Sequence, residues 1–80
     1  MPWHVYIIGC SDGKFYTGIT NNLKRRIKEH NSGNGCKFTR SRIPVELRYH
    51  ILLRSRSEAL KEEARIKTLT RLEKINLIKN

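Results

Sequence analysis

The amino-acid sequence predicts an α+β domain in which a small three-stranded antiparallel sheet is flanked by helices, in the order ββαβαα. Two segments rich in β-branched and aromatic residues, 3–9 and 14–20, are separated by the turn sequence SDG. A third segment, residues 45–53, alternates and then becomes apolar, as a strand does. Helical spacing of apolar residues marks the other structured segments. With only 80 residues, we expect one domain over residues 1–80.

The turn between the first two strands decides which side chains share a face of the sheet. Residues 12–13 can form a two-residue I′ turn, which pairs Cys10 with Phe15 and points the two tyrosines apart. Alternatively, residues 11–13 form a three-residue loop with a left-handed glycine and a G1 bulge. Because side chains alternate along a strand, the two turns assign opposite faces.

We favour the three-residue loop because it separates the phenols from the apolar side chains. It pairs Ile8 with Tyr16 and Tyr6 with Gly18, so both tyrosines lie on one face. The other face is then apolar and consists of Val5, Ile7, Phe15 and Ile19. Gly18, opposite Tyr6, is expected to leave an open space on the face that carries the tyrosines.

A helix is predicted for residues 22–31, because capping residues precede it and Gly33 follows it. The candidate caps are Thr20, Asn21 and Asn22. The next segment, residues 32–44, is rich in glycine, serine and basic residues and is expected to be a loop.

The same helix presents one arginine and one histidine beside its buried side. Leu23 and Ile27 define the buried stripe. Arg26 and His30 fall directly beside that stripe, whereas Arg25 points further toward solvent. We therefore expect Arg26, rather than Arg25, to be held rigidly at the edge of the domain.

Two capping boxes begin the C-terminal helices. Residues 55–58, SRSE, open a helix that extends to about Thr68, and residues 70–73, TRLE, open a short last helix. Helical spacing predicts that the inward side chains of the last helix are Leu72, Ile75 and Ile78.

One acid lies on the predicted core side of the helix that follows residue 55. The apolar arc of this helix consists of Ala59, Leu60, Ala64 and Ile66. Glu63 falls inside the arc and Glu62 outside it. A carboxylate there is costly unless a cation meets it. That cation is either Lys67, one turn further on, or a divalent metal such as Mg²⁺, which accepts one carboxylate together with waters and phosphate oxygens.

The charge of the chain points to polyanionic partners. Lysine and arginine number 17 against 7 aspartates and glutamates, which gives a formal net charge of +10. Nucleic acid is favoured over a membrane, because no apolar run approaches the ~20 residues of a spanning helix and residues 1–4 do not begin a signal peptide. Cys10 and Cys36 form neither a disulfide scaffold nor a zinc site, so we expect a reducing, cytoplasmic setting.

Taken together, the motifs resemble those of the GIY-YIG endonuclease domain, most closely its small stand-alone bacterial subfamily, over nearly all of the chain. The first signature corresponds to HVY at residues 4–6 and the second to YTG at residues 16–18. The family's arginine and histidine, four residues apart, correspond to Arg26 and His30, and its metal-binding glutamate corresponds to Glu63. Each motif alone is weak, whereas the ordered set is specific.

The sequence departs from the family pattern in small ways. Both triplets keep their tyrosine, but HVY replaces GIY and YTG replaces YIG. Phe38 stands where relatives often carry tyrosine, so one hydroxyl is lost there.

The resemblance implies hydrolysis of phosphodiester bonds in DNA, in branched, damaged or single-stranded forms, with one divalent metal, Mg²⁺ or Mn²⁺. The residues it implies are Tyr6, Tyr16, Arg26, His30 and Glu63, with Glu63 as metal ligand and Gly18 in a structural role. We expect a cation to favour the phenolate of the general base, which we assign to Tyr6, while Tyr16 orients water or phosphate; the two roles are exchangeable. Arg26 would neutralise charge on the phosphoryl oxygens. His30 would relay a proton or contact phosphate, unless it is simply a helix-end residue favoured by the dipole.

Six further cations are candidates for holding the nucleic-acid backbone: Lys24, Arg25, Lys28, Lys37, Arg40 and Arg42. We find no base-reading element, so specificity would come from nucleic-acid shape or from a protein partner. The alternative function is a basic nucleic-acid-binding module that does not cut, and a membrane-surface or protein-docking domain is the third hypothesis. The enzyme is favoured because a pure binder has no need of Glu63, which repels phosphate unless a metal is bound.

Overall fold

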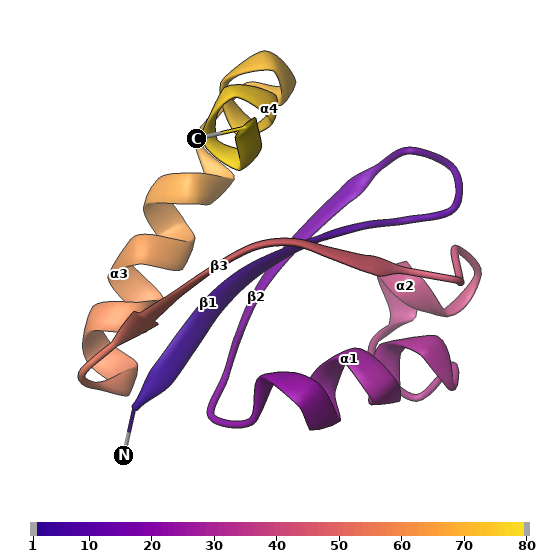
Figure 1. Ribbon diagram of the computed structural model, residues 1–80, viewed down its shortest axis with the longest axis horizontal. Helices are drawn as coiled ribbons and strands as arrows, with labels where there is room; N and C mark the ends of the chain where they lie inside the picture. Colours follow the sequence, from indigo (N-terminus) through magenta and orange to yellow (C-terminus); the bar gives the residue numbers. More distant parts are fainter. Residues whose placement is uncertain (1, 80) are drawn as a thin grey trace.

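The computed structural model describes residues 2–79. Its elements are β1 (Trp3–Gly9), β2 (Phe15–Thr20), α1 (Leu23–Asn31), α2 (Lys37–Arg40), β3 (Glu46–Leu53), α3 (Arg56–Lys67) and α4 (Arg71–Lys79). The strands form one antiparallel sheet in the order β2-β1-β3, so β1 is the central strand (Figure 1). The predicted three-stranded sheet and the order ββαβαα are confirmed, with the short helix α2 added between α1 and β3.

Helix α2 lies within residues 32–44, where the sequence predicts a loop. Its single turn begins after Cys36, whose carbonyl accepts the backbone N–H of Arg40 at 3.1 Å. Thr39 is fully buried, and its hydroxyl contacts His30 of α1. A contact with the preceding helix thus stabilises this turn, and such a contact leaves no periodic pattern in the residues themselves.

The β1–β2 hairpin has the register of the three-residue loop. Tyr6 pairs with Gly18 and Ile8 with Tyr16, and Gly13 has a φ of 86°. Such a positive φ is strain-free only for glycine, so Gly13 fits the predicted bulge. The register confirms that Tyr6 and Tyr16 share a face of the sheet.

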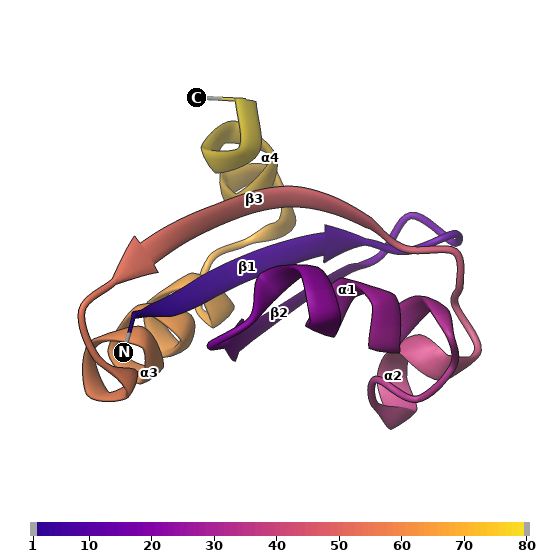
Figure 2. The same ribbon diagram turned by 60° about the horizontal axis from the view of Figure 1, so that its bottom comes forward.

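Two clusters of buried side chains lie on opposite faces of the sheet. On the face that we call the apolar face, the buried residues are Val5, Ile7, Ala59 and Ile66. On the face that we call the tyrosine face, they are Tyr6, Ile8, Cys10 and Val45. Leu23 and Ile27 of α1 pack against the tyrosine face as predicted, while α3 covers the apolar face. Figures 1 and 2 show α1 and α3 on either side of β2.

Helix α3 buries a different arc from the one that its apolar residues predict. Ala59 and Ile66 are fully buried, but Leu60 and Ala64 are exposed. Residues 59 and 66 are seven positions apart, close to two helical turns, so they define a line of contact along one side of the helix. This line runs past positions 62 and 63 and away from the other two apolar residues.

Both glutamates of α3 next to this line are largely covered. The side chains of Glu62 and Glu63 are 22% and 18% exposed, so the prediction that Glu62 lies outside the buried arc is wrong. Glu62 pairs with Arg65 at 2.7 Å, and Glu63 pairs with Lys67 at 3.3 Å. The ion pairs allow both carboxylates to lie at the edge of the core.

Helix α4 begins at a complete capping box. The Thr70 N–H donates to the Glu73 carboxylate at 2.8 Å, and the Glu73 N–H donates to the Thr70 hydroxyl at 3.2 Å. The two isoleucines predicted to face inward are partly buried, but Leu72 is 67% exposed and Leu77 packs on the apolar face instead. Spacing misassigns Leu72 because this short helix carries large aliphatic residues on several sides. Neither α4 nor any other helix within residues 2–79 is long and apolar enough to cross a membrane.

Candidate active site

A chain of buried hydrogen bonds links β1, α1 and α2 on the tyrosine face. The Tyr6 hydroxyl lies 2.9 Å from Nε2 of His30, and Nδ1 of His30 lies 2.8 Å from Oγ1 of Thr39. We assign the hydroxyl proton of Thr39 to the Cys36 carbonyl, 3.4 Å away, so that the Thr39 oxygen accepts Nδ1–H of the imidazole. Nε2 is then unprotonated and accepts the hydroxyl proton of Tyr6. The network therefore holds His30 as a neutral imidazole.

The electrostatic surroundings favour the same protonation states. Burial lowers the pKa of His30, and the positive charge of Arg26 lowers it further. Burial raises the pKa of Tyr6, and the neighbouring Arg26 offsets only part of this increase. Tyr6, which is 1% exposed, is therefore a neutral phenol at pH 7 beside a neutral imidazole. An ionised Tyr6, expected from the sequence beside a cation, is not favoured by Arg26 alone.

Tyr16 lies beside this chain of hydrogen bonds. Its ring centroid is 6.5 Å from that of Tyr6 and 5.4 Å from that of His30, and it stacks on Phe38 with centroids 5.8 Å apart. Burial raises the pKa of Tyr16 strongly, and the nearby Cys36 thiol raises it further. Tyr16 is less deeply buried than Tyr6. The two phenols differ, because Tyr6 has a proton acceptor and Tyr16 is the more accessible.

Arg26 is held at the edge of the same cluster. Nη1 donates to the Glu29 carboxylate at 3.1 Å, and Nη2 donates to the Gly35 carbonyl at 2.9 Å. The Arg26 side chain is 28% exposed, compared with 61% for Arg25. Arg26 is thus the fixed arginine of the pair, and its guanidinium remains partly accessible to an anion.

Gly18 does not leave the open space that its position opposite Tyr6 predicts. A Cβ atom at Gly18 would lie 2.6 Å from the Tyr6 hydroxyl oxygen and 3.2 Å from the ring of Tyr16. The phenol of Tyr6 itself fills this space. Glycine is required here because a larger residue would push the hydroxyl of Tyr6 from its place beside His30.

Glu63 comes from the helix on the other face of the sheet. It pairs with Lys67, as the non-functional interpretation predicts. Its negative charge also acts at Tyr6, where it contributes to the raised pKa of the phenol. Within residues 2–79, no three histidine, cysteine, aspartate or glutamate side chains group closely enough to hold a metal ion. Glu63 is therefore a single candidate ligand and not part of a preformed cage.

Comparison with known families identifies the chain. The model of the GIY-YIG catalytic domain matches residues 2–76. This chain belongs to the GIY-YIG family. The family is generally one of endonucleases that use divalent metals, and it suggests nucleic acid as the substrate. The resemblance found in the sequence is confirmed.

Similar GIY-YIG chains carry the name UPF0213. One from Halobacterium salinarum is 54% identical over 89% of this chain and 92% of its own, and one from Streptococcus agalactiae is 46% identical over 99% and 90%. The solution NMR structure of a UPF0213 protein from Bacillus halodurans is 43% identical, with a TM-score of 0.64 over 99% of this chain and 84% of that one. An E. faecalis protein solved by the same method is 42% identical, with a TM-score of 0.67 and the same coverage. These names state no activity.

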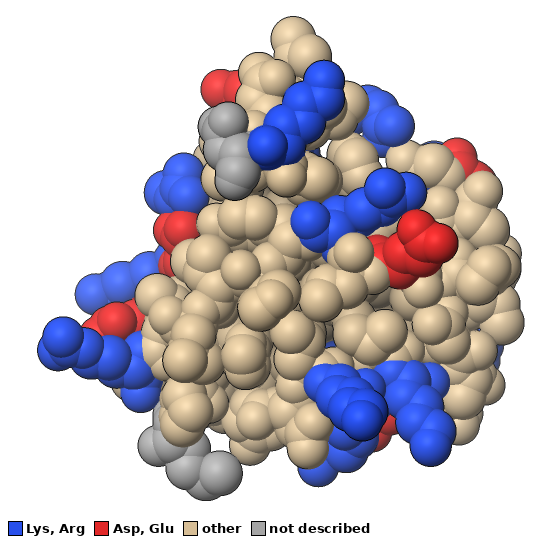
Figure 3. All heavy atoms as spheres, viewed as in Figure 1, with Lys and Arg blue, Asp and Glu red and all other residues tan. Residues whose placement is uncertain are grey.

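The six cations predicted to hold nucleic acid have different surroundings in this GIY-YIG chain. The exposed ones are Lys24, Arg25, Lys28, Lys37 and Arg40. Figure 3 shows lysine and arginine side chains gathered over α1. Arg42 instead pairs with Asp12 at 2.9 Å, and its guanidinium lies 4.3 Å from the ring centre of Phe38. Arg42 therefore joins the hairpin to α2, and its role is at least partly structural.

Thr39 and Cys36 contact the candidate site but are absent from the sequence-based candidates. Thr39 orients the imidazole of His30. Burial raises the pKa of the Cys36 thiol, but hydrogen bonds from Thr39 and Tyr16 outweigh this effect and lower it. The sequence of residues 32–44 does not reveal Thr39 as a site residue, because its buried partner, His30, lies on a different helix.

Proposed function

We propose that this GIY-YIG chain is an endonuclease that hydrolyses phosphodiester bonds in DNA, with Tyr6 as general base and one divalent metal ion. The observation that carries the proposal is the hydrogen bond from Tyr6 to a neutral, buried His30, with Arg26 close to both. A tyrosine alone is a poor base at pH 7, and burial makes Tyr6 harder to ionise. A proton acceptor behind the phenol removes that difficulty, because no free phenolate has to form beforehand.

In the proposed reaction, the oxygen of a water molecule forms a bond to phosphorus while the bond from phosphorus to the leaving oxygen breaks. The water gives a proton to the Tyr6 oxygen as Tyr6 passes its own hydroxyl proton to Nε2 of His30. His30 becomes an imidazolium ion. Thr39 continues to accept from Nδ1, so the ring keeps its orientation during the transfer.

Arg26 and Tyr16 position the phosphate in this proposal. The partly exposed guanidinium of Arg26 neutralises negative charge that grows on the phosphoryl oxygens. Tyr16, the less buried of the two tyrosines, orients water or phosphate through its hydroxyl. The exposed cations of α1 and α2 hold the flanking backbone.

Glu63 would hold the divalent metal, Mg²⁺ or Mn²⁺. A single, largely covered carboxylate suits a hard cation that keeps several waters and takes other ligands from phosphate. When bound, the ion supplies Lewis-acid stabilisation to the phosphoryl group and the leaving oxygen. Because Lys67 pairs with the same carboxylate, metal and Lys67 compete for Glu63, and we expect weak metal affinity without substrate.

A nucleic-acid-binding module that does not cut is the second candidate, and the burial of Tyr6 favours it. With 1% of this residue exposed, water reaches the phenol only after the side chains that cover it move. A protein partner that supplies specificity would fit either function.

Cleavage assays with matched variants test the proposal. Branched and linear DNA are incubated with the protein and Mg²⁺ or Mn²⁺, and parallel samples contain a chelator. We expect nicking that disappears in chelator and in Arg26→Ala and Glu63→Ala. The neighbouring control Glu62→Ala should retain it, because its side chain lies outside the proposed chemistry, whereas Arg25→Ala should weaken DNA binding without abolishing nicking. Tyr6→Phe should abolish nicking, whereas Tyr16→Phe should reduce it.

The binding module is identified by a different set of results. Its signature is DNA binding that is unchanged in Arg26→Ala, with no nick under any metal. Under the endonuclease proposal, Glu63→Ala binds DNA at least as tightly as the wild type without metal, since a negative charge is removed. If Tyr16→Phe is the variant that abolishes nicking, the general base is Tyr16.

A further inference from the structure

We propose that a groove between the β1–β2 hairpin and α4 binds a single strand of nucleic acid that leads away from the candidate active site. This inference rests on the proposed function, because it takes nucleic acid as the substrate. It narrows the substrate class to DNA that carries a single-stranded segment. The groove starts beside the aromatic cluster of the site, passes the edge of β2, and ends on the apolar face.

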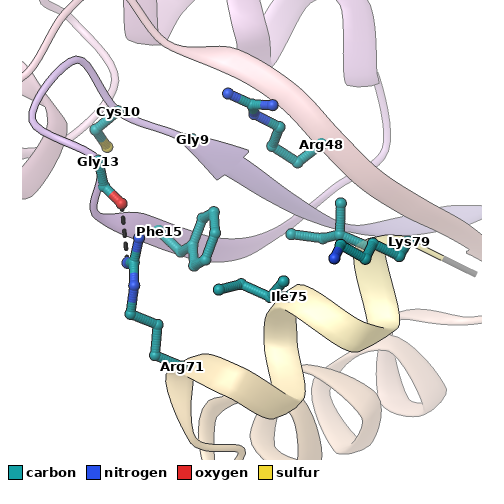
Figure 4. A pocket seen from close by; sticks show the side chains of 9 residues that line it. Gly9, Cys10, Gly13, Phe15, Arg48, Arg71, Ile75 and Lys79 are labelled. Atoms are coloured by element: carbon teal, nitrogen blue, oxygen red, sulfur yellow. Dashed lines mark hydrogen bonds between the residues drawn. The ribbon is translucent and has the colours of Figure 1, made fainter.

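The groove consists of two hollows that share Phe15 and Arg71. The larger has a volume of about 370 Å³ and lies between the hairpin, β3 and α4 (Figure 4). The smaller has a volume of about 230 Å³ and reaches Phe38. Phe38 in turn stacks on Tyr16 of the candidate site. The two hollows therefore adjoin at Phe15 and Arg71, and together they extend from Phe38, beside the candidate site, to α4.

The lining of the groove combines cations with aromatic rings. None of the residues that line the two hollows is acidic. The cations are Lys14, Arg48, Arg71, Lys74 and Lys79. The Arg71 guanidinium lies 4.8 Å from the ring centre of Phe15. Proteins hold single strands in this way, with cations along the backbone and aromatic rings on which bases stack.

Backbone features direct Arg48 into the larger hollow. The pairing of β1 with β3 shifts between Ile7 and Ile8 and leaves Arg48 as the extra residue of a β-bulge. A Cβ atom at Gly9 would lie 2.8 Å from Nε of Arg48, so glycine provides the room that the arginine occupies. Figure 4 shows Arg48 extending from β3 across the hollow from α4. The bulge and the glycine together direct Arg48 toward this face, where its guanidinium also pairs with the exposed Glu46 at 3.6 Å.

The dimensions of the groove suit a single strand better than a duplex. Pockets of roughly 300–1,000 Å³ hold small organic ligands, so the larger hollow has room for about one base. Arg71 and Lys79 lie at the two ends of α4, whose nine residues span about 13 Å. That length corresponds to about four phosphates of a stacked strand at ~3.4 Å each.

Binding of a fluorescent single-stranded oligothymidylate tests the groove, with anisotropy measured in chelator so that cleavage cannot intervene. The variants are Arg48→Ala, Lys79→Ala and Phe15→Leu. The matched control is Lys61→Ala, an exposed lysine of α3 that lines neither hollow. We expect each groove cation to contribute about 0.7 to the slope of log K against log salt. Phe15→Leu should weaken binding at least about fivefold, while Lys61→Ala leaves the slope unchanged.

An equal slope of log K against log salt in Arg48→Ala, Lys79→Ala and Lys61→Ala would overturn the proposal that the groove binds nucleic acid. Duplex binding that is as tight, and as sensitive to Phe15→Leu, overturns the preference for a single strand. Phe15 is partly buried, so thermal unfolding checks the fold of that variant; the two exposed cations decide the test if it unfolds. Failure of the nuclease proposal is separate, because oligothymidylate binding requires no cutting. If nicking occurs but tailed and blunt duplexes are cut equally by wild type and Arg48→Ala, the groove fails and the nuclease stands.

Discussion

The two faces of the sheet exclude solvent by different means. The buried cluster on the apolar face is aliphatic and consists of Val5, Ile7, Ala59 and Ile66, while Thr17, paired with Ile7, adds a buried hydroxyl. On the tyrosine face, fully buried His30 and Thr39 are joined with Tyr6 by hydrogen bonds. One face is thus closed mainly by apolar area, and the other depends on a polar network.

The apolar face therefore mainly stabilises the fold, whereas the tyrosine face carries groups of the candidate active site. Apolar burial contributes about 25 cal/mol per Å² and does not depend on the protonation of any group. A buried polar group costs free energy when its donor or acceptor loses its partner. We therefore expect the apolar face to respond to lost volume, and the tyrosine face to respond to a single lost atom or a single added proton.

The largest effect on stability is expected from Ile66→Ala on the apolar face. Ile66 is fully buried between α3 and the sheet, so truncation removes apolar contacts and leaves a cavity. The free energy of unfolding should fall by about 2–5 kcal/mol, measured by urea denaturation. The loss should be equal at pH 5.5 and pH 7.5, because the substitution changes no titratable group.

Leu72→Ala is the control for this prediction. Leu72 is 67% exposed, and truncation should change the free energy of unfolding by no more than about 0.5 kcal/mol. A loss at Leu72 as large as that at Ile66 would contradict the observed orientation of α4.

On the apolar face, the sequence predicts the register of the hairpin but not the orientation of α4. The hairpin register follows from Gly13 and from strict alternation, both of which are local features. The outward position of Leu72 does not follow, because a short helix with aliphatic residues on several sides permits more than one inward arc. Packing against β3 selects the arc, and packing is not encoded in the spacing of one helix.

The sequence predicts which residues lie on the tyrosine face but not the hydrogen bonds that connect them. Strand alternation and helical spacing place Tyr6, Tyr16, Arg26 and His30 near one another. The hydrogen bond from Tyr6 to His30 depends on how α1 crosses the sheet, which no local pattern fixes. Thr39 was missed for the same reason, since its helical turn is stabilised by His30 itself.

An intermediate effect is expected from Tyr6→Phe on the tyrosine face. The substitution keeps the ring and removes one oxygen, so it opens almost no cavity but leaves Nε2 of His30 without its donor. The free energy of unfolding at pH 7.5 should fall by about 1–3 kcal/mol. Tyr49→Phe on the apolar face is the matched control, with an expected change of no more than about 0.5 kcal/mol. Equal losses in the two variants would show that the hydroxyl chain is not what stabilises this face.

The smallest effect is expected from a change of pH, through His30. Its pKa in the folded chain is lowered by burial, below the unfolded value of about 6.5. The unfolded chain therefore binds the proton first as the pH falls. The stabilising contribution of neutral His30 is complete above pH ~6.5 and is lost as the pH decreases toward the folded-state pKa. A proton on Nε2 also removes the acceptor of the Tyr6 hydroxyl.

Two histidine variants isolate this contribution. His30→Asn removes the titration while keeping an amide that can donate toward Thr39, so its free energy of unfolding should fall less steeply than that of the wild type between pH 7 and pH 5. His50→Asn, an exposed histidine of β3, should keep the wild-type slope. Denaturation curves at several pH values measure both slopes. If His30→Asn and the wild type have the same slope, the imidazole is not held neutral by the fold, and the proton transfer from Tyr6 to His30 loses its physical basis.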